Sequence, residues 1–277
     1  SGDKCEVVVS TRVRLARNLE EYPFPAKLNA EGKAQVNALV RDALLGGCEE
    51  DLSYIEMESL SRAQAISLAE RHLISPEFAS APKGRALMLS EDESVSIMLC
   101  EEDHIRLQVM ESGLALDSAY KRADNLDNAV AQKLQLAFDE RIGFLTQCPT
   151  NLGTAMRASV MLHLPGLSKS GQITKIAATV SKLGLIIRGA YGEGSSPIGD
   201  LYQLSNQVTL GISEETALSN LKAIAQQLVA QELNVREQML KSPAWEDKIF
   251  RALGILQNAR LLSCDEFMQL SSLVRLG

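Results

Sequence analysis

The chain has 277 residues, of which 45% are hydrophobic, and its formal net charge at pH 7 is −7. This length and composition predict one large folded domain, with or without a smaller companion, and exclude a disordered chain. The acidic balance argues against general nucleic-acid binding, although a basic pocket can exist in an acidic protein. The five cysteines are widely spaced and no apolar run reaches about 18 residues, so we predict a cytoplasmic protein without disulfides, structural zinc or membrane span.

Hydrophobic spacing predicts both helices and strands in the N-terminal half. Apolar residues at helical spacing predict three helices, at 30–45, 60–73 and 115–138. Short valine- or leucine-rich runs predict four strands, at 6–10, 86–89, 95–100 and 105–110. Short acidic turns separate the last three strands, which favours antiparallel pairing.

The C-terminal half is predicted to be richer in helices. Three helices are expected, one following a loop with capping residues at Gln147–Asn151 and running through Leu162, and two at 173–183 and 214–240. Two strands are expected at 185–187 and 208–210, with a flexible glycine- and serine-rich loop at 192–199 between them. After Pro243 the pattern predicts helices only, near 245–262 and 265–274, so we place a domain boundary between residues 242 and 243.

Arginines recur in four short, motif-like settings: Ser10–Arg14, Glu101–Arg106, Arg157 and Ile187–Gly189. Planar guanidinium groups suit an anion with several oxygens, such as a polyphosphate. Glu102 precedes Arg106 and Glu193 follows Arg188, so the same region carries both signs of charge. Such a site is suited to holding a phosphate donor beside a cationic acceptor.

Several familiar nucleotide, hydrolase and metal motifs are absent from the sequence. GxxxxGK[ST], GxGxxG, GxSxG, HExxH and the HRD and DFG pair do not occur, which argues against Walker-type ATPases and the protein-kinase fold. The histidines, His72, His104 and His163, are too scattered to predict a metal site.

Four motifs, in this order, resemble the phosphagen (guanidino) kinase superfamily: Ser10–Arg14, Glu101–Arg106, Cys148–Thr154 and Arg188–Glu193. Flanking segments resemble the bacterial protein-arginine kinases of that superfamily, among them Arg14–Leu19, His72–Pro76 and Met161–Pro165. Each motif alone is weak, but the ordered set is specific. The resemblance implies an α+β fold for residues 1–242, with a large, mostly antiparallel sheet flanked by helices. It implies that residues 243–277 are an all-helical segment, the start of a truncated C-terminal domain.

The resemblance also implies an activity. The γ-phosphoryl group of Mg-ATP is transferred to a guanidinium nitrogen, and in the bacterial branch the acceptor is an arginine side chain on a protein. Modified proteins would be marked for an ATP-dependent protease, with a heat-shock repressor among the substrates and an activator protein as a further partner. No direct nucleic-acid or membrane partner is expected.

Family members usually carry a leader helix before the first strand and continue beyond Val-Arg-Leu-Gly with helices that dimerise and bind phosphoarginine. We therefore expect this sequence to be a shortened form or a short homologue, and a homodimer in a full-length form.

Site residues follow from the same motifs. The resemblance implies that five arginines bind the ATP phosphates, with His72 near the nucleotide: Arg12, Arg14, Arg106, Arg157 and Arg188. Independently, Arg12 and Arg14 alternate on an extended segment and so point to one face. Each arginine alone would be an ordinary ion-pairing residue. Mg²⁺ is expected to be held mainly through ATP, without protein ligands.

On the acceptor side, Glu102 and Glu193 are expected to orient the guanidinium and to accept its proton. Cys148 is expected to orient and tune the guanidinium and not to act as a covalent nucleophile. Without the resemblance, Glu102 would be read as a turn carboxylate, Glu193 as an exposed loop charge and Cys148 as an inert buried thiol. His104 could lie near the nucleotide or in the core, and Arg17 could be functional or form a surface ion pair.

Two positions depart from the family pattern. Cys100 stands where the family usually has Asn, and Ala155 where it usually has Gly. Neither removes a charged group, so activity is expected to survive with altered loop geometry.

Two other functions stay open at this point. A small-molecule kinase for free arginine or creatine usually carries a helical domain before the first strand, and its absence from this sequence favours a protein acceptor. A non-catalytic module that binds nucleotide or phosphoarginine would not need both glutamates and all five arginines.

Overall fold

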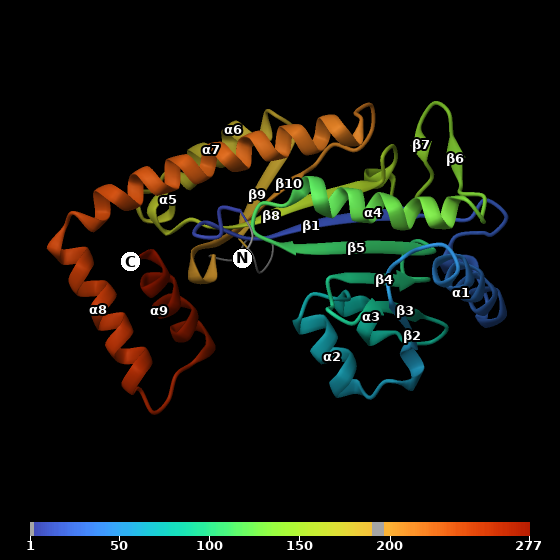
Figure 1. Cartoon of the computed structure of the whole chain (residues 1–277), viewed down its shortest axis with the longest axis horizontal. Coiled ribbons are helices and arrows are strands. Elements are labelled where there is room, and N and C mark those ends of the chain that lie inside the picture. Colours follow the sequence, from blue (N-terminus) through green and yellow to red (C-terminus); the bar gives the residue numbers. More distant parts are fainter. Residues whose placement is uncertain (1–2, 190–196) are drawn as a thin grey trace.

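The computed structural model describes residues 3–189 and 197–277. Its centre is an eight-stranded antiparallel sheet with the strand order β2-β3-β4-β5-β1-β8-β10-β9 (Figure 1). The strands of the sheet are β1 (Val8–Arg17), β2 (Leu52–Glu56), β3 (Ala86–Ser90), β4 (Val95–Leu99), β5 (Ile105–Ser112), β8 (Met156–His163), β9 (Leu185–Gly189) and β10 (Leu201–Asn206). A separate two-stranded hairpin is formed by β6 (Phe138–Asp139) and β7 (Gly143–Phe144).

The helices are α1 (Ala30–Leu45), α2 (Arg62–Glu70), α3 (Pro76–Ser80), α4 (Leu116–Ala131), α5 (Pro165–Lys169), α6 (Ile173–Ser181), α7 (Glu214–Leu240), α8 (Pro243–Asn258) and α9 (Cys264–Leu276). The described ranges also contain single turns of 3-10 helix, η1 (Pro25–Lys27), η2 (Met57–Ser59), η3 (Pro149–Asn151) and η4 (Ile198–Asp200). The predicted α+β class, with a large antiparallel sheet and a helical C-terminal segment, is confirmed. No helix in the described ranges is long and apolar enough to cross a membrane.

One face of the sheet carries the main hydrophobic core. Side chains of β1 alternate, so Val13 and Leu15 are buried on this face while Arg12 and Arg14 point to the other. Helices α1, α4, α6 and α7 supply the opposing apolar residues of this core. Figure 1 shows α4 and α7 lying along the sheet. This face is therefore closed to ligands.

The second face is covered over only part of its width. A smaller core packs α2 and α3 against Leu87 of β3 and Met98 of β4. Beyond β4 the same face, from β5 to β9, carries mainly polar and charged side chains. The fold thus leaves a broad hydrophilic surface beside the smaller core under α2 and α3, and this surface holds the candidate site.

Two predicted elements in the C-terminal half are wrong. The predicted helix ending at Leu162 is instead the strand β8, whose buried residues Met156, Ala158, Val160 and Leu162 recur at every second position. The strand predicted at 208–210 is instead β10 (Leu201–Asn206), which lies upstream of the predicted range and pairs with both β8 and β9. Val208 and Leu210 lie in a loop and are 45% and 52% exposed.

Other predicted boundaries shift. The helix expected to reach Phe138 ends at Ala131, and Phe138 lies 55% exposed in the β6–β7 hairpin. The first strand is longer than expected, because it extends to Arg17, and β2 was not predicted. The helices at 30–45, 173–183 and 214–240 and the three strands β3, β4 and β5 are confirmed, the helix boundaries to within two residues.

The C-terminal helices pack back on the rest of the chain through α9. Leu276 and Ser272 of α9 are buried. Gly199 of η4 approaches α9 so closely that a Cβ there would lie 3.0 Å from the carbonyl oxygen of Met268, and its φ of 65° also favours glycine. The contact between α9 and η4 is therefore made at backbone distance.

Candidate active site

Strand register gathers the predicted arginines on the uncovered face. Arg14 of β1 lies directly opposite Arg157 of β8, and the next residue on the same face of β1, Ala16, lies opposite Arg106 of β5. Directly opposed side chains in antiparallel strands have Cβ atoms only about 5 Å apart. Arg14, Arg106, Arg157 and Glu102 line one hollow together. Arg188 of β9 lines the adjoining hollow with Arg14 and Arg157.

The arginines destabilise one another's charge. Burial lowers the pKa of Arg14 well below its ordinary value, and the charges of Arg12, Arg106 and Arg157 lower it further. The Arg14 Nε is buried and has no hydrogen-bond partner within the described residues. Burial and Arg106 likewise lower the pKa of Arg12. A cluster of cations that repel each other and keep an unused donor fits a multiply charged anion.

Neighbouring residues hold two of these arginines in place. Arg106 donates from Nη1 to Glu101 Oε2 at 2.6 Å, and Glu101 also accepts a hydrogen bond from Ser75, the N-cap of α3. Arg157 donates to Asn151 Oδ1 at 3.2 Å and to the backbone carbonyls of residues 150, 206 and 207. Their guanidinium planes are thus fixed before any ligand binds, which lowers the entropy cost of binding.

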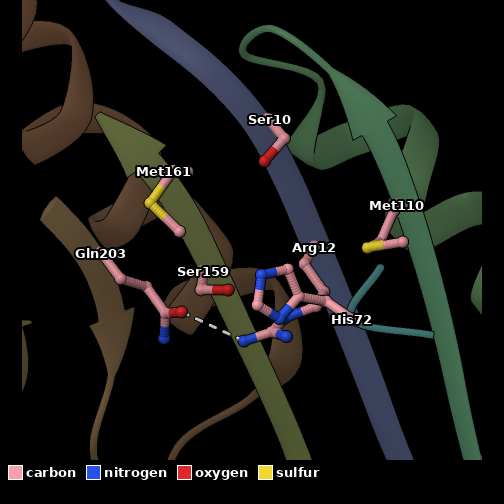
Figure 2. A pocket seen from close by; sticks show the side chains of 7 residues that line it. All are labelled: Ser10, Arg12, His72, Met110, Ser159, Met161 and Gln203. Atoms are coloured by element: carbon pink, nitrogen blue, oxygen red, sulfur yellow. Dashed lines mark hydrogen bonds between the residues drawn. The ribbon is translucent and has the colours of Figure 1, made fainter. Parts of the chain in front are cut away.

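A third hollow, of about 140 Å³, adjoins the cluster at Arg12. Figure 2 shows its lining, with Met161 and Gln203 on one side and Met110 and His72 on the other. Arg12 donates from Nη2 to Gln203 Oε1 at 3.1 Å. Burial and the charge of Arg12 lower the pKa of His72, so its imidazole is favoured in the neutral form. The hollow combines apolar thioethers with hydroxyl, amide and imidazole groups.

The turn that carries Glu102 is pinned by a buried hydrogen-bond network. Asp103 Oδ1 accepts from Asn18 Nδ2 at 2.7 Å and from the backbone N–H of Gln147 at 2.8 Å. The Asn18 side chain accepts from the N–H of His104 at 2.9 Å. The network therefore ties the Glu102 turn to the end of β1 and to the segment that leads to Cys148.

Glu102 itself is exposed at the rim of the arginine hollow. Burial raises its pKa, as do the neighbouring carboxylates Asp103 and Glu101, while Arg106 acts in the opposite direction. A raised pKa makes a carboxylate a better proton acceptor.

Cys148 lies next to the hollows without lining them. Its Sγ is 3.0 Å from Thr150 Oγ1, and the residues that follow it, Pro149 to Asn151, line the two arginine hollows. The predicted helix start after Cys148 is wrong, because only the three-residue turn η3 forms there. A helix dipole therefore does not act on this thiol.

The other sequence candidates fall into different places. His104 is fully buried, where its Nδ1 accepts from the N–H of Leu19 at 3.0 Å, so it belongs to the core. Arg17 is buried and not at the surface, with its Nη2 2.7 Å from Asp127 Oδ2 and its guanidinium 3.6 Å from the centre of the Phe144 ring. Glu193 lies outside the described residues.

Both departures from the family pattern occupy left-handed backbone. Cys100 has a φ of 58° and Ala155 a φ of 47°. Asn and Gly are the residues that tolerate this region best, so the family's usual residues match the geometry and this chain carries the strain instead. Burial raises the pKa of the Cys100 thiol to about 12, which makes it chemically inert.

Sequence reasoning missed the residues that hold the arginines. Gln203, Glu101 and Asn151 bond to Arg12, Arg106 and Arg157 respectively. The alternation of buried Tyr202, Leu204 and Asn206 was the available signal for the strand of Gln203. Glu101 lies beside Glu102 in the motif, and nothing in the sequence distinguishes their orientations.

Comparison with known proteins agrees with this geometry. The family model described as ATP:guanido phosphotransferase, C-terminal catalytic domain, matches residues 35–235, and a second, described as Protein-arginine kinase McsB C-terminal domain, matches residues 242–277. Among solved structures, the duplicated taurocyamine kinase from Schistosoma mansoni is similar with a TM-score of 0.74 and 30% identity, over 82% of this chain and 33% of that chain. A lombricine kinase has a TM-score of 0.76 and 25% identity, over 86% of this chain and 69% of that one.

The fold, the arginine cluster and these matches define an enzyme of the kinase class. The protein-arginine kinase of Caldanaerobacter subterraneus subsp. tengcongensis is 44% identical over 98% of this chain and 82% of that relative. The protein-arginine kinase of Halothermothrix orenii is 43% identical over 100% of this chain and 80% of that relative. The chain therefore belongs to the ATP:guanido phosphotransferase family, in its protein-arginine kinase branch.

Proposed function

We propose that this enzyme transfers the γ-phosphoryl group of Mg-ATP to a guanidinium nitrogen of an arginine side chain in a protein. The observation that carries the proposal is the convergence of Arg14, Arg106 and Arg157 on one hollow with Glu102 at its rim. The arginines would balance the negative charge of a polyphosphate, and the carboxylate would balance the positive charge of a guanidinium acceptor. The name of the curated relatives, protein-arginine kinase, supports the choice of acceptor.

The residues present fit ATP. The partnerless Nε of Arg14 offers a donor, and the lowered pKa values of Arg12, Arg14 and Arg157 show that positive charge there is undercompensated. Burial is the largest cause of each of these shifts, and nearby arginines add to all three. Phosphate oxygens would pair with these groups and hold the transferring group in line with the acceptor. Mg²⁺, bound through the phosphates, would neutralise negative charge that develops on their oxygens.

The hollow beside Arg12 suits the nucleoside part of ATP. Met110 and Met161 offer adaptable, polarisable contact to a base, and Ser10 and Ser159 offer hydroxyl groups to polar edges. Arg12 lies at the junction, because it lines this hollow and its charge also acts on Arg14. The base and the phosphates would thus lie on neighbouring strips of the same sheet face.

On the acceptor side, Glu102 would accept hydrogen bonds from the guanidinium and orient the attacking nitrogen. A bond forms between that nitrogen and the γ-phosphorus. The bond from the γ-phosphorus to the bridging oxygen breaks, and ADP leaves with its electron pair. The proton of the attacking nitrogen passes to a carboxylate, for which the raised pKa of Glu102 is favourable. Glu193 is proposed as the second carboxylate and Cys148 as an orienting group, both on the family resemblance.

The cellular role is proposed on the same resemblance. Phosphorylated proteins would be marked for ATP-dependent proteolysis in the cytoplasm, with a heat-shock repressor among the substrates and an activator protein as partner. A full-length form would be a homodimer.

The test is intact-mass analysis of an arginine-rich protein after incubation with the enzyme and Mg-ATP, with free arginine in parallel. An acid-labile gain of about 80 Da per site on the protein is the expected result. Glu102→Gln should retain nucleotide binding and reduce transfer by about 10² to 10⁴. Glu237→Gln, an exposed change on α7 across the sheet, is the matched control. A fully active Glu102→Gln enzyme would refute the assignment of Glu102.

A second candidate is a kinase for free guanidino compounds. The likeness to the taurocyamine and lombricine kinases favours it, since taurocyamine and lombricine are small guanidino compounds. Phosphorylation of free arginine without phosphorylation of the protein would select this candidate. Binding of ATP without transfer to either acceptor would indicate a non-catalytic module.

A further inference from the structure

A buried line of polar side chains joins the C-terminal helix α9 to the sheet. Arg236 of α7 lies 3.1 Å from His163 Nδ1, and His163 Nε2 lies 2.9 Å from Ser272 Oγ of α9. Ser272 Oγ lies 2.6 Å from Asp200 Oδ2. All four residues are buried, and none belongs to the arginine site. Polar groups at this depth persist only when each finds a partner.

The hydrogen bonds of this line have one consistent direction. Arg236 can only donate, so His163 Nδ1 accepts and His163 Nε2 carries the proton. Nε2–H then donates to Ser272, whose hydroxyl proton is directed to the Asp200 carboxylate. Ser272 is the single residue of α9 in the line, and it receives and passes on one hydrogen bond.

Asp200 occupies a demanding backbone position at the end of this line. Its φ is 54°, in the left-handed region that non-glycine residues adopt at a cost. Three contacts hold it there. Its Oδ2 accepts from Ser272 and from Lys169 Nζ at 2.8 Å, and its carbonyl accepts from the N–H of Leu164 at 2.9 Å.

The strand β10 begins at the next residue, Leu201, and leads to the hollow beside Arg12, which Gln203 lines. Gln203 is three residues beyond Asp200, about 10 Å along the strand. Its side chain accepts the hydrogen bond from Arg12 that Figure 2 shows as a dashed line. A shift at the start of β10 therefore changes the position of Gln203 relative to Arg12.

We propose that Ser272 and Asp200 are positioning residues for the nucleotide site. The C-terminal helix, through the Ser272 hydroxyl, fixes the start of β10 and so holds Gln203 against Arg12. This inference rests on the proposed function only in taking Arg12 as an ATP ligand. It assigns to α9, which the second family model covers, a direct part in the geometry of the site that the first family model covers.

The experiment compares Ser272→Ala with Ser271→Ala in the full chain. Ser271 is the adjacent residue of the same helix and is less buried, so the two variants differ only in position. We expect Ser272→Ala to raise the Kd and the KM for Mg-ATP about two- to tenfold, the range that one hydrogen bond supplies. The kcat and the KM for the acceptor should change little, and Ser271→Ala should match the wild type.

A double-mutant cycle tests whether Ser272 affects ATP binding through Gln203. Gln203→Ala should weaken ATP binding by itself, and adding Ser272→Ala should then weaken it little further, because both changes act on one contact. Additive effects would overturn the route through Gln203. A structural role alone would lower the melting temperature without this coupling.

Because Ser272→Ala leaves buried groups unpaired, Asp200→Asn is the second variant. It keeps the shape of the side chain but weakens the bonds to Ser272 and Lys169, and it should raise the KM for ATP in the same way. An unchanged KM in a folded Asp200→Asn enzyme, or in a folded Ser272→Ala enzyme, overturns the inference alone. A wild-type chain that fails to bind ATP overturns the proposed function and this inference with it.

Discussion

Arg14 and Arg157 face each other directly across the β1–β8 pair, on the uncovered side of the sheet. Like charges in directly opposed positions destabilise an antiparallel pair. The same register brings β5 alongside, so that Arg106 adds a third positive charge. A protein retains such an arrangement where function needs it, at the expense of its own stability. The residues whose charges repel one another are therefore the same residues that form the candidate site.

Replacing Arg14 by Met should stabilise the free enzyme and weaken ATP binding. The substitution removes a buried cation that three other arginines repel, and methionine retains an apolar chain in place of the aliphatic stem of the arginine. We expect the free energy of unfolding to rise by about 1 to 3 kcal/mol. Denaturant unfolding without nucleotide measures the first effect, and titration with Mg-ATP measures the second.

The control for Arg14 is Arg41→Met. Arg41 is partly exposed and pairs with the neighbouring exposed Asp42, so this change should alter the free energy of unfolding by no more than about 0.5 kcal/mol. A loss of stability in Arg14→Met would show that the arginines are compensated in the free protein, contrary to the electrostatic argument.

Ala155→Gly should stabilise the protein. Ala155 adopts a φ of 47°, which costs an alanine more than a glycine, although glycine loses more chain entropy on folding. The net gain should be about 0.5 to 1 kcal/mol in the free energy of unfolding. Ala158→Gly, three residues along in β8, is the matched control and should destabilise, because Ala158 is buried in ordinary strand geometry. If both variants lose stability, the left-handed strain at Ala155 is not a significant cost.

The fold was predictable where local pattern and tertiary context agree. The runs that became β3, β4 and β5 are bounded by acidic turns, and the spacing of α1 and α7 is helical. β8 was misassigned because its buried set, Met156 to Leu162 at every second residue, is made partly of residues that also favour helices. Its central place between β1 and β10, which no local pattern reveals, decides its conformation.

The candidate site was predictable in its charged residues and not in its supporting ones. Short motifs single out Arg12, Arg14 and Arg106, because arginines in such settings are chemically distinctive. Gln203 has no such signature, and its contact with Arg12 depends on the pairing of β10 with β8. Strand register is a property of the whole sheet. Contacts that depend on the register, such as the one between Gln203 and Arg12, therefore cannot be predicted from local sequence patterns.

The pH dependence of transfer should report on Glu102. Burial and the neighbouring carboxylates raise its pKa, so on acidification it takes up a proton earlier than an ordinary glutamate. Protonated Glu102 can no longer accept the acceptor's proton, and kcat should therefore fall on the acid side, beginning above about pH 4.3, the ordinary glutamate value. A pH–rate profile at saturating ATP measures this. If the residual activity of Glu102→Gln falls at the same acidic pH as that of the wild type, the fall is caused by another titrating group.

Acid should destabilise the fold through His163. Its pKa is lowered from 6.5 to about 3, first by burial and then by Arg236 and Arg275. Below the unfolded pKa of about 6.5, the unfolded chain binds a proton that the folded chain does not, which favours unfolding. The stability that neutral His163 contributes is therefore complete only above about pH 6.5. As the pH falls toward about 3, the free energy of unfolding should decrease by up to about 1.4 kcal/mol per pH unit from this residue.

His163→Asn should remove that component, because asparagine does not titrate. The measurement is the difference in slope of unfolding free energy against pH between wild type and variant, from pH 4 to 6 (roughly the window in which only the unfolded state is protonated). The slope is informative even if the variant is less stable at neutral pH. His72→Asn is the control, and since His72 is exposed, solvent screening should make its slope change smaller. Equal slopes for wild type and His163→Asn would mean that His163 is protonated in the folded protein, so that its Nδ1 could not accept the hydrogen bond from Arg236.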